Sequence, residues 1–307
     1  MGVTVPGTGK PKRLKLDPND PVTVLREGVI RALLALPGYF EFGNPVSGIN
    51  ATDLFSLNSL LGAAIETEVV RTLNKLRNVW DPGGAWTGFR FERSSQAFPD
   101  VRLVSRSGGE PRIAIGIELK GWYLLAKEGV PSMRYQVAPA ACAPHDLICV
   151  VPWHLSNAVS GTAEVIEPWV ESARYAAEYR DYWWSFIRKA KSHKKGVSYP
   201  EAASPYPSKA DLVSARPQED GGGNFGRLPR ASGLMDGFID NSKLHEVLGI
   251  PVSDWVAFLQ LHSDSATPDE IGLALSAEVA RHTAKIAPGA AEEVFLLLQR
   301  IARLIDP

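Results

Sequence analysis

The chain has 307 residues, 45% hydrophobic and 22% charged, a composition typical of globular proteins that argues against disordered, fibrous and membrane classes. The formal net charge is -1, so DNA binding would need a local basic patch. Cys142 and Cys149 are too few for a disulfide framework, no second Cys/His pair stands nearby, and the six histidines do not pair at metal-ligand spacing. A reducing, cytoplasmic location is expected, without secretion or membrane insertion, because no apolar run has the required length.

The first part of the chain is expected to form a basic arm followed by two helices. Residues 1–18 carry several lysines and predict a flexible arm. Asp20 followed by Pro21 offers a helix cap with proline at the first helical position, and the amphipathic pattern beyond it predicts a helix that ends near Leu36. Apolar residues at helical spacing predict a second helix over 57–76.

After the Pro-Gly-Gly turn at 81–84 the apolar spacing changes from helical to alternating, which predicts strands. Three successive strands are expected over 86–92, 98–104 and 112–120. The last two are joined by a Gly-Gly turn and should form a hairpin. A continuous apolar run at 146–153 has the length of a buried strand.

The second half of the chain is expected to be mainly helical. An aromatic-rich helix is predicted over 167–191, and residues 196–233 are rich in Pro, Gly, Ser and Ala, as in a linker or long loop. Helical signals in 234–307, including a capping box from Thr267 to Glu270, predict an α-helical C-terminal region. Helices followed along the chain by a mixed sheet and then by further helices predict an α/β fold.

The predicted hairpin carries the residues that point to a chemistry. Side chains alternate along a strand, so Glu118 and Lys120 should project from one face and the strand's isoleucines from the other. A reasonable register brings Asp100, on the preceding strand, beside Glu118. Two close carboxylates attract a hard divalent cation, and oxygen ligands favour magnesium or manganese over zinc. Lys120 could then stabilise the negative charge that develops when a phosphodiester bond is hydrolysed.

A Pro-Asp pair ending at Asp100, a short gap and a Glu-Leu-Lys triplet from Glu118 to Lys120 resemble the PD-(D/E)XK nuclease superfamily over roughly residues 57–155. The resemblance implies a restriction-endonuclease-like core over 19–195, with a central mixed β-sheet flanked by helices. It also implies a metal held by Asp100 and Glu118, water activated near Lys120, and products with a 5′-phosphate and a 3′-hydroxyl.

In that superfamily a helix before the hairpin often contributes a further acidic residue. Glu66 stands in the matching place and is assigned a catalytic role by the resemblance, with Glu68 as the rival candidate. The alternative interpretation makes Glu66 a solvated helix residue or an ion-pair partner of Arg71 or Arg90.

Within the superfamily, the chain's size, its long aromatic and basic helix and its extra C-terminal region look most like a type II restriction endonuclease. This implies an enzyme that cuts double-stranded DNA with Mg²⁺, or Mn²⁺ as a substitute, as a homodimer with a DNA methyltransferase as companion. A repair, recombination or phage-defence nuclease and a non-cleaving DNA-binding protein remain alternatives. The densest basic run could contact phosphates or be a solvated face: Arg188, Lys189, Lys191, Lys194 and Lys195.

Overall fold

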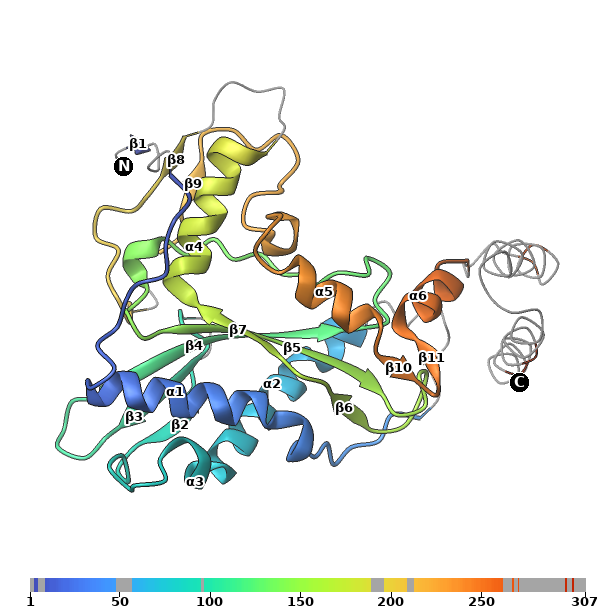
Figure 1. The fold of residues 1–307 in the computed structure, drawn as a ribbon, viewed down its shortest axis with the longest axis horizontal. Coiled ribbons are helices and arrows are strands. Elements are labelled where there is room, and N and C mark those ends of the chain that lie inside the picture. Colours follow the sequence, from blue (N-terminus) through green and yellow to red (C-terminus); the bar gives the residue numbers. More distant parts are fainter. Residues whose placement is uncertain are drawn as a thin grey trace.

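The structure is a computed structural model that describes residues 3–4, 9–47, 57–94, 97–188, 196–208 and 213–261, together with positions 267, 270, 296 and 300. Helices pack along a curled central sheet in a mixed α/β arrangement (Figure 1). None of the helices in these ranges is long and apolar enough to cross a membrane.

The helices are α1 (Pro21–Leu34), α2 (Leu57–Lys75), α3 (Arg77–Trp80), α4 (Ala173–Tyr182), α5 (Asp236–Lys243) and α6 (Val252–Leu261). Short 3-10 turns occupy Leu36–Gly38, Pro139–Ala141 and Leu228–Arg230, and a π-helical turn extends α4 over Trp183–Ile187. The strands are β1 (Val3–Thr4), β2 (Arg90–Arg93), β3 (Val101–Ser105), β4 (Arg112–Tyr123), β5 (Leu147–Leu155), β6 (Ala163–Val165), β7 (Trp169–Ser172), β8 (Val197–Ser198), β9 (Arg216–Pro217), β10 (Glu246–Val247) and β11 (Ile250–Pro251).

The main sheet is mixed and has the order β2-β3-β4-β5-β6, with β7 also paired to β5. β2, β3 and β4 are antiparallel, whereas β4 and β5 are parallel. β7 borders the first half of β5 and β6 borders its end. The predicted hairpin is confirmed as β3 and β4, and the apolar run is confirmed as β5, whose residues are all buried.

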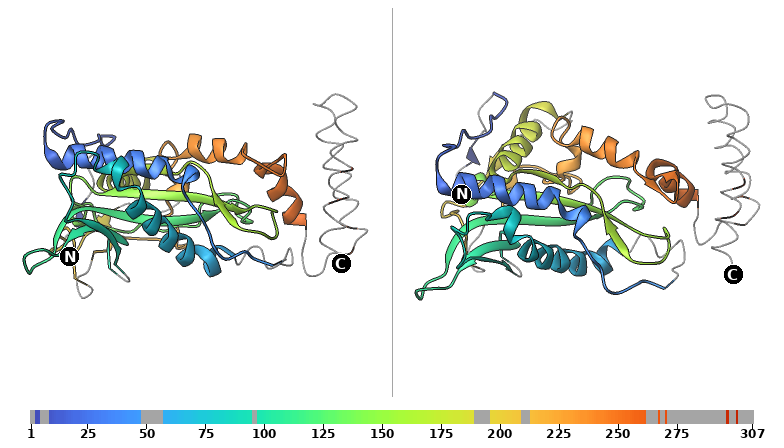
Figure 2. Two further views of the ribbon diagram at one scale, coloured as in Figure 1. Left: turned by 90° about the horizontal axis from the view of Figure 1, so that it is seen from below. Right: turned by 60° about the horizontal axis from the view of Figure 1, so that its bottom comes forward.

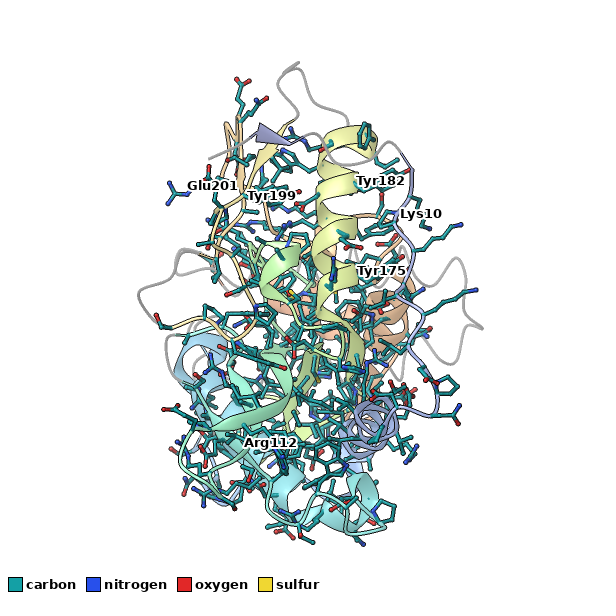
Figure 3. The ribbon with its side chains drawn as sticks, turned by 90° about the vertical axis from the view of Figure 1, so that its left-hand side faces the viewer. Lys10, Arg112, Tyr175, Tyr182, Tyr199 and Glu201 are labelled. Carbon is teal, nitrogen blue, oxygen red and sulfur yellow. The ribbon has the colours of Figure 1, made fainter. Side chains whose placement is uncertain are left out.

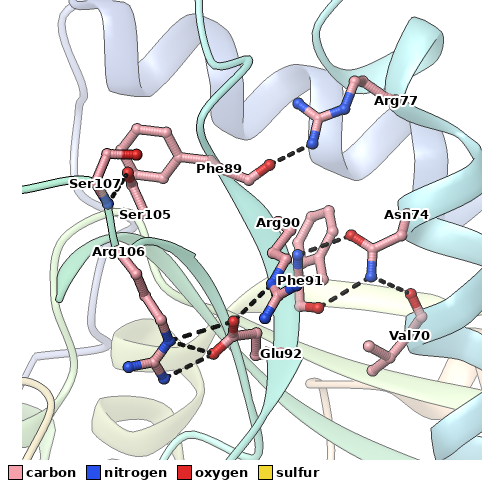
Figure 4. Close-up of polar contacts among 10 residues, drawn as sticks. All are labelled: Val70, Asn74, Arg77, Phe89, Arg90, Phe91, Glu92, Ser105, Arg106 and Ser107. Atoms are coloured by element: carbon pink, nitrogen blue, oxygen red, sulfur yellow. Dashed lines mark hydrogen bonds and ion pairs between the residues drawn. The ribbon is translucent and has the colours of Figure 1, made fainter.

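The two N-terminal helices are confirmed. Asp20 caps α1 by accepting a hydrogen bond from the backbone N–H of Thr23, with Pro21 as the first helical residue. The helix α2 is tied to the edge strand β2 by Asn74, whose side-chain amide accepts from the backbone N–H of Phe91 and donates to its carbonyl (Figure 4). This pairing fixes α2, and the acidic residues on it, against the sheet.

The strand expected over 86–92 begins later than predicted, at Arg90. The reason is a local turn: Asp81 accepts from the backbone N–H of Trp86, and Arg77 donates to the carbonyls of Trp86 and Phe89 (Figure 4 draws the Phe89 bond). These bonds use backbone groups that a longer strand would have offered to a neighbour.

The single helix predicted over 167–191 is wrong at its start. Residues Trp169–Ser172 form β7 along β5, and α4 begins only at Ala173, where Ser172 caps it by accepting from the backbone N–H of Tyr175. The tyrosines and tryptophans at helical spacing extend the apparent helix, but the unpaired edge of β5 gives the preceding residues a backbone partner. The part beyond Arg188 lies outside the described residues.

The C-terminal predictions are confirmed in part. A helix begins at Asp236 rather than after Asp240, and the helix expected after Ser253 is α6. The capping box is present: the Glu270 side chain accepts from the backbone N–H of Thr267, and the Thr267 hydroxyl accepts from that of Glu270. Helix α6 and the β10–β11 hairpin lie at the opposite end of the described structure from the β3–β4 loop (Figures 1 and 2).

The basic arm, where the structure describes it, contacts β7 and α4. Arg13 donates to Glu171, with 2.5 Å between Nη2 and Oε2, and its guanidinium lies 4.4 Å from the ring centre of Tyr175. The ammonium of Lys10 lies 5.4 Å from another tyrosine ring of α4, and Figure 3 shows Lys10 beside that helix. Residues 10 and 13 are therefore held by ion-pair and cation–π contacts.

Residues 196–233, expected to form a linker or long loop, contribute buried side chains. Val197 and Phe225 are fully buried, and the edge of the Trp184 ring meets the Phe225 ring. The backbone N–H of Tyr135 donates to a carbonyl of this stretch over 2.7 Å. The described parts of this stretch therefore pack against α4 and the core.

Candidate functional site

Asp100 and Glu118 are brought together by the register of the β3–β4 hairpin. Val101 pairs with Ile117, so Asp100, the residue before β3, comes opposite Glu118. The backbone N–H of Leu119 donates to Asp100 Oδ2 over 3.2 Å, which fixes the aspartate against β4. The structure therefore places side by side the two carboxylates that the sequence pattern expected to be neighbours.

Lys120 completes the group on the same face of β4. Its Nζ lies 3.1 Å from Asp100 Oδ2 and 3.2 Å from Glu118 Oε1, so one ammonium contacts both carboxylates. The side chains of Asp100 and Lys120 are about 30% exposed, whereas that of Glu118 is only 10% exposed. The group thus opens to solvent on one side and is anchored by a buried carboxylate on the other.

The charges of this group perturb its own ionisation. Burial, and then the negative charge of Asp100, raise the pKa of Glu118 to about 7 against the opposing effect of Lys120. Burial alone would lower the pKa of Lys120, but the two carboxylates outweigh it and raise that pKa above the ordinary value. Lys120 therefore remains an ammonium at neutral pH, suited to stabilising negative charge rather than to accepting a proton.

The raised pKa of Glu118 predicts a pH-dependent gain of stability in Glu118→Gln. Between pH 4.5 and about 7 the folded chain holds a proton on Glu118 that the unfolded chain releases, so ionisation of this residue reduces stability as pH rises through that window. Lys120 is protonated in both the folded and the unfolded chain over this pH range, so its ionisation does not change the free energy of unfolding there. We expect Glu118→Gln to match the wild type at pH 4 and to melt on the order of 5 °C higher at pH 8.

Calorimetric melting in EDTA at the two pH values measures this difference. Glu110→Gln is the matched control, because Glu110 is an exposed residue of the β3–β4 loop. A lower melting temperature for Glu118→Gln at pH 8 would show that the ionised carboxylate stabilises the fold.

Of the two acidic candidates on α2, Glu66 is the one that reaches the site. It accepts a hydrogen bond from the backbone N–H of Gly121 and pairs with Arg93 Nη2 over 3.1 Å. Burial raises the pKa of Glu66 and the negative charge of Asp100 adds to this effect, whereas the positive charge of Lys120 opposes it. Glu68 instead pairs with Arg71 on its own helix at 2.5 Å, as an i,i+3 neighbour does.

A buried aspartate that the sequence analysis did not select lies next to the site, against Gly116 on the face of β4 that carries Glu118. Asp146 is fully buried, and its Oδ1 accepts from the backbone N–H of Gly116 over 2.7 Å and from the Tyr206 hydroxyl over 2.8 Å. Its Oδ2 accepts from the backbone N–H of Ala143 over 2.7 Å. Burial raises the pKa of Asp146 to about 6, while these hydrogen bonds lower it. Asp146 thereby connects β4, the start of β5 and the 196–208 segment.

The donor set at Asp100 and Glu118 fits a hard cation such as Mg²⁺. Both residues supply carboxylate oxygens, and their mutual repulsion, visible in the raised pKa of Glu118, is the kind that a bound cation relieves. With the side chains in their present rotamers, no three His, Cys, Asp or Glu residues of the described ranges are grouped closely enough to hold a metal by themselves. Mg²⁺ commonly binds through one or two carboxylates and completes its shell with water and substrate phosphate, so two suffice.

The basic run proposed for DNA contact is only partly visible. The Arg188 guanidinium lies 3.4 Å from the ring centre of Trp184, and burial lowers its pKa. Lys189, Lys191, Lys194 and Lys195 lie outside the described residues.

Two contacts near the candidate site were not predicted from the sequence: the Arg93–Glu66 pair and the Asp146–Tyr206 hydrogen bond. Their partners are 27 and 60 residues apart in the chain, so no local motif marks them. No protein-family model matches the chain, and a search of curated proteins finds no match either.

Proposed function

We propose that the chain is a magnesium-dependent endonuclease of the PD-(D/E)XK type that hydrolyses phosphodiester bonds in double-stranded DNA. The observation that carries this proposal is the contact of one lysine with two carboxylates from adjacent strands, at 3.1 and 3.2 Å. A mixed sheet in which an antiparallel hairpin precedes a parallel strand is compatible with a restriction-endonuclease-like core.

The proposed roles follow from position and charge. Asp100 and Glu118 would hold Mg²⁺, with Mn²⁺ as a substitute, and the ion would lower the pKa of an attacking water and polarise the phosphate. Lys120, kept as an ammonium, would stabilise the charge that develops on the phosphate oxygens. Glu66, bonded to the backbone N–H of Gly121, would keep α2 aligned with the end of β4 and orient Lys120.

The finer assignment is a type II restriction enzyme that acts as a homodimer and has a DNA methyltransferase as its companion. A two-fold pair of subunits places two sites on a symmetric duplex, one for each strand. The described chain carries a single group of this kind, at Asp100, Glu118 and Lys120, which fits one strand cut per subunit.

Incubation of the purified protein with supercoiled plasmid and Mg²⁺ tests the proposal. Discrete fragments would support a restriction enzyme, whereas smearing or structure-dependent nicking would support a repair, recombination or phage-defence nuclease on the same core. DNA binding without cleavage in Mg²⁺ and in Mn²⁺ would overturn the proposed activity. Gel electrophoresis distinguishes these outcomes.

Glu66 and Glu68 offer a comparison within one helix. Glu66→Gln is expected to slow cleavage about 10-fold, since a residue that orients the primary ligands typically contributes that much. Glu68→Gln should stay within about twofold of the wild type, because Glu68 pairs with Arg71 and not with the site. Initial cleavage rates at saturating Mg²⁺ measure both. Equal losses in the two variants would contradict the assignment of Glu66.

A further inference from the structure

Two histidines that are distant in the sequence meet at the C-terminal end of β5. His154, near the end of β5, is buried, and its Nε2 lies 3.2 Å from Nε2 of His245, which follows α5. The backbone of His245 is held by a hydrogen bond from the N–H of Val252 to its carbonyl over 2.8 Å. The pair therefore joins the C-terminal α5–α6 region to the central sheet.

The hydrogen bonds of His154 determine which of its nitrogens can act as a ligand. Its Nδ1 lies 3.0 Å from the carbonyl oxygen of Leu155, which can only accept, so Nδ1 carries the proton. Nε2 of His154 then accepts a hydrogen bond from Nε2–H of His245 over 3.2 Å, and a metal ion bound between the two nitrogens would displace that one proton. A histidine whose other ring nitrogen donates to a backbone carbonyl is oriented in the manner of metal-binding histidines.

The separation of the two nitrogens also matches chelation. Two ligand nitrogens about 2.0–2.1 Å from a tetrahedral zinc ion stand about 3.3 Å apart. The observed 3.2 Å agrees with this spacing without movement of either ring.

A carboxylate stands beside the pair. Glu164 on β6 is directly opposite His154 in the antiparallel register, and its Oε2 lies 3.9 Å from His154 Nε2. The Glu164 side chain is 56% exposed, so it can rotate toward a bound ion at little cost. An open hollow of about 450 Å³, lined in part by Glu167, Asn241 and His245, gives access from solvent.

We propose that His154, His245 and Glu164 form a binding site for a borderline divalent metal ion of the zinc class, separate from the carboxylate site at Asp100 and Glu118. Two imidazole nitrogens are already in chelating positions, and the carboxylate closes on the ion when it binds. The chemistry of the donors distinguishes the two sites, since nitrogen ligands favour zinc-like ions and oxygen ligands favour magnesium. Bound metal would fasten α5 and the β10–β11 hairpin to the β5–β6 edge.

Titration of the EDTA-stripped full chain with Zn²⁺ by calorimetry, and with Co²⁺ by its visible absorption, tests this site. The wild type is expected to bind one equivalent, with the absorption bands of tetrahedral cobalt, in the presence of millimolar Mg²⁺. His245→Gln should weaken binding about 100-fold, and Glu164→Gln about 10-fold. His145→Gln and Asp100→Asn should bind as the wild type does, since neither residue contacts the pair.

Melting temperatures show whether a variant loses metal binding only because it is unfolded. In EDTA the wild type and His245→Gln are expected to melt alike, and Zn²⁺ should raise the melting temperature of the wild type only. Absence of one-to-one binding by the wild type, or equal affinity of the wild type and His245→Gln, would overturn the proposal. Wild-type affinity in Glu164→Gln would overturn the assignment of the carboxylate. The binding and melting measurements do not depend on DNA cleavage, so the two proposed sites are tested independently.

Discussion

Replacement of Lys120 by alanine is expected to slow plasmid cleavage 10²- to 10³-fold at saturating Mg²⁺, the range found when one charge-stabilising group is removed from a transition state. The same loss or a larger one is expected for Asp100→Asn and Glu118→Gln, but for a different reason. Those variants remove carboxylate charge from the ion site, whereas Lys120→Ala leaves both carboxylates in place.

The dependence on Mg²⁺ concentration separates the two causes. Half-saturation should move to higher Mg²⁺ in Asp100→Asn and Glu118→Gln, and should stay the same or fall in Lys120→Ala, because the competing ammonium is gone. Single-turnover cleavage at several Mg²⁺ concentrations measures this. Lys75→Ala is the control, since Lys75 is a half-exposed residue of α2 that pairs with Glu41. Wild-type cleavage by Lys120→Ala would refute the site.

Gly116→Ala is expected to destabilise the protein by about 1–3 kcal/mol, the range for overpacking a filled core, and to abolish cleavage. A Cβ at Gly116 would collide with Pro99 Cγ and lie 2.9 Å from Asp146 Oδ1. Neither neighbour can withdraw easily, because Pro99 is a ring within the chain and Asp146 is held by three hydrogen bonds. Displacement of Pro99 moves Asp100, and with it the carboxylate pair.

Gly62→Ala provides the matched control for this substitution. A Cβ at Gly62 on α2 meets nothing within 4 Å, so alanine there should be neutral or stabilise by up to about 1 kcal/mol through its higher helix propensity. Chemical denaturation of the two variants gives the comparison. Equal stability of Gly116→Ala and the wild type would mean that the β3–β4 packing relaxes without strain.

The elements that could be predicted are those whose signals are local. Asp20 and Pro21 mark the start of α1 through a cap that spans three residues, and the apolar run of β5 reflects burial along its whole length. The local sequence patterns gave wrong predictions where a contact with a distant segment determines the structure. Residues Trp169–Ser172 extend as β7 because β5 offers them an edge, although the aromatic spacing behind them is helical.

The same division applies to the two sites. Asp100, Glu118 and Lys120 lie on a hairpin, so strand alternation and a short turn were enough to predict that they meet. The choice of Glu66 over Glu68 depended on how α2 is rotated against β4, which the helical pattern leaves open. His154 and His245 are 91 residues apart and share no motif, so spacing gave no sign of them.

The sequence by itself thus determined the grouping of Asp100, Glu118 and Lys120, because residue type, strand period and hairpin connection are properties of neighbouring residues. The tertiary structure alone decided what surrounds these three residues. It placed Asp146 against Gly116, turned Glu66 toward Gly121 and brought His245 to His154. The physical reason is that burial, pKa shifts and ligand geometry arise from contacts between segments distant in the chain, and such contacts leave no periodic pattern to read.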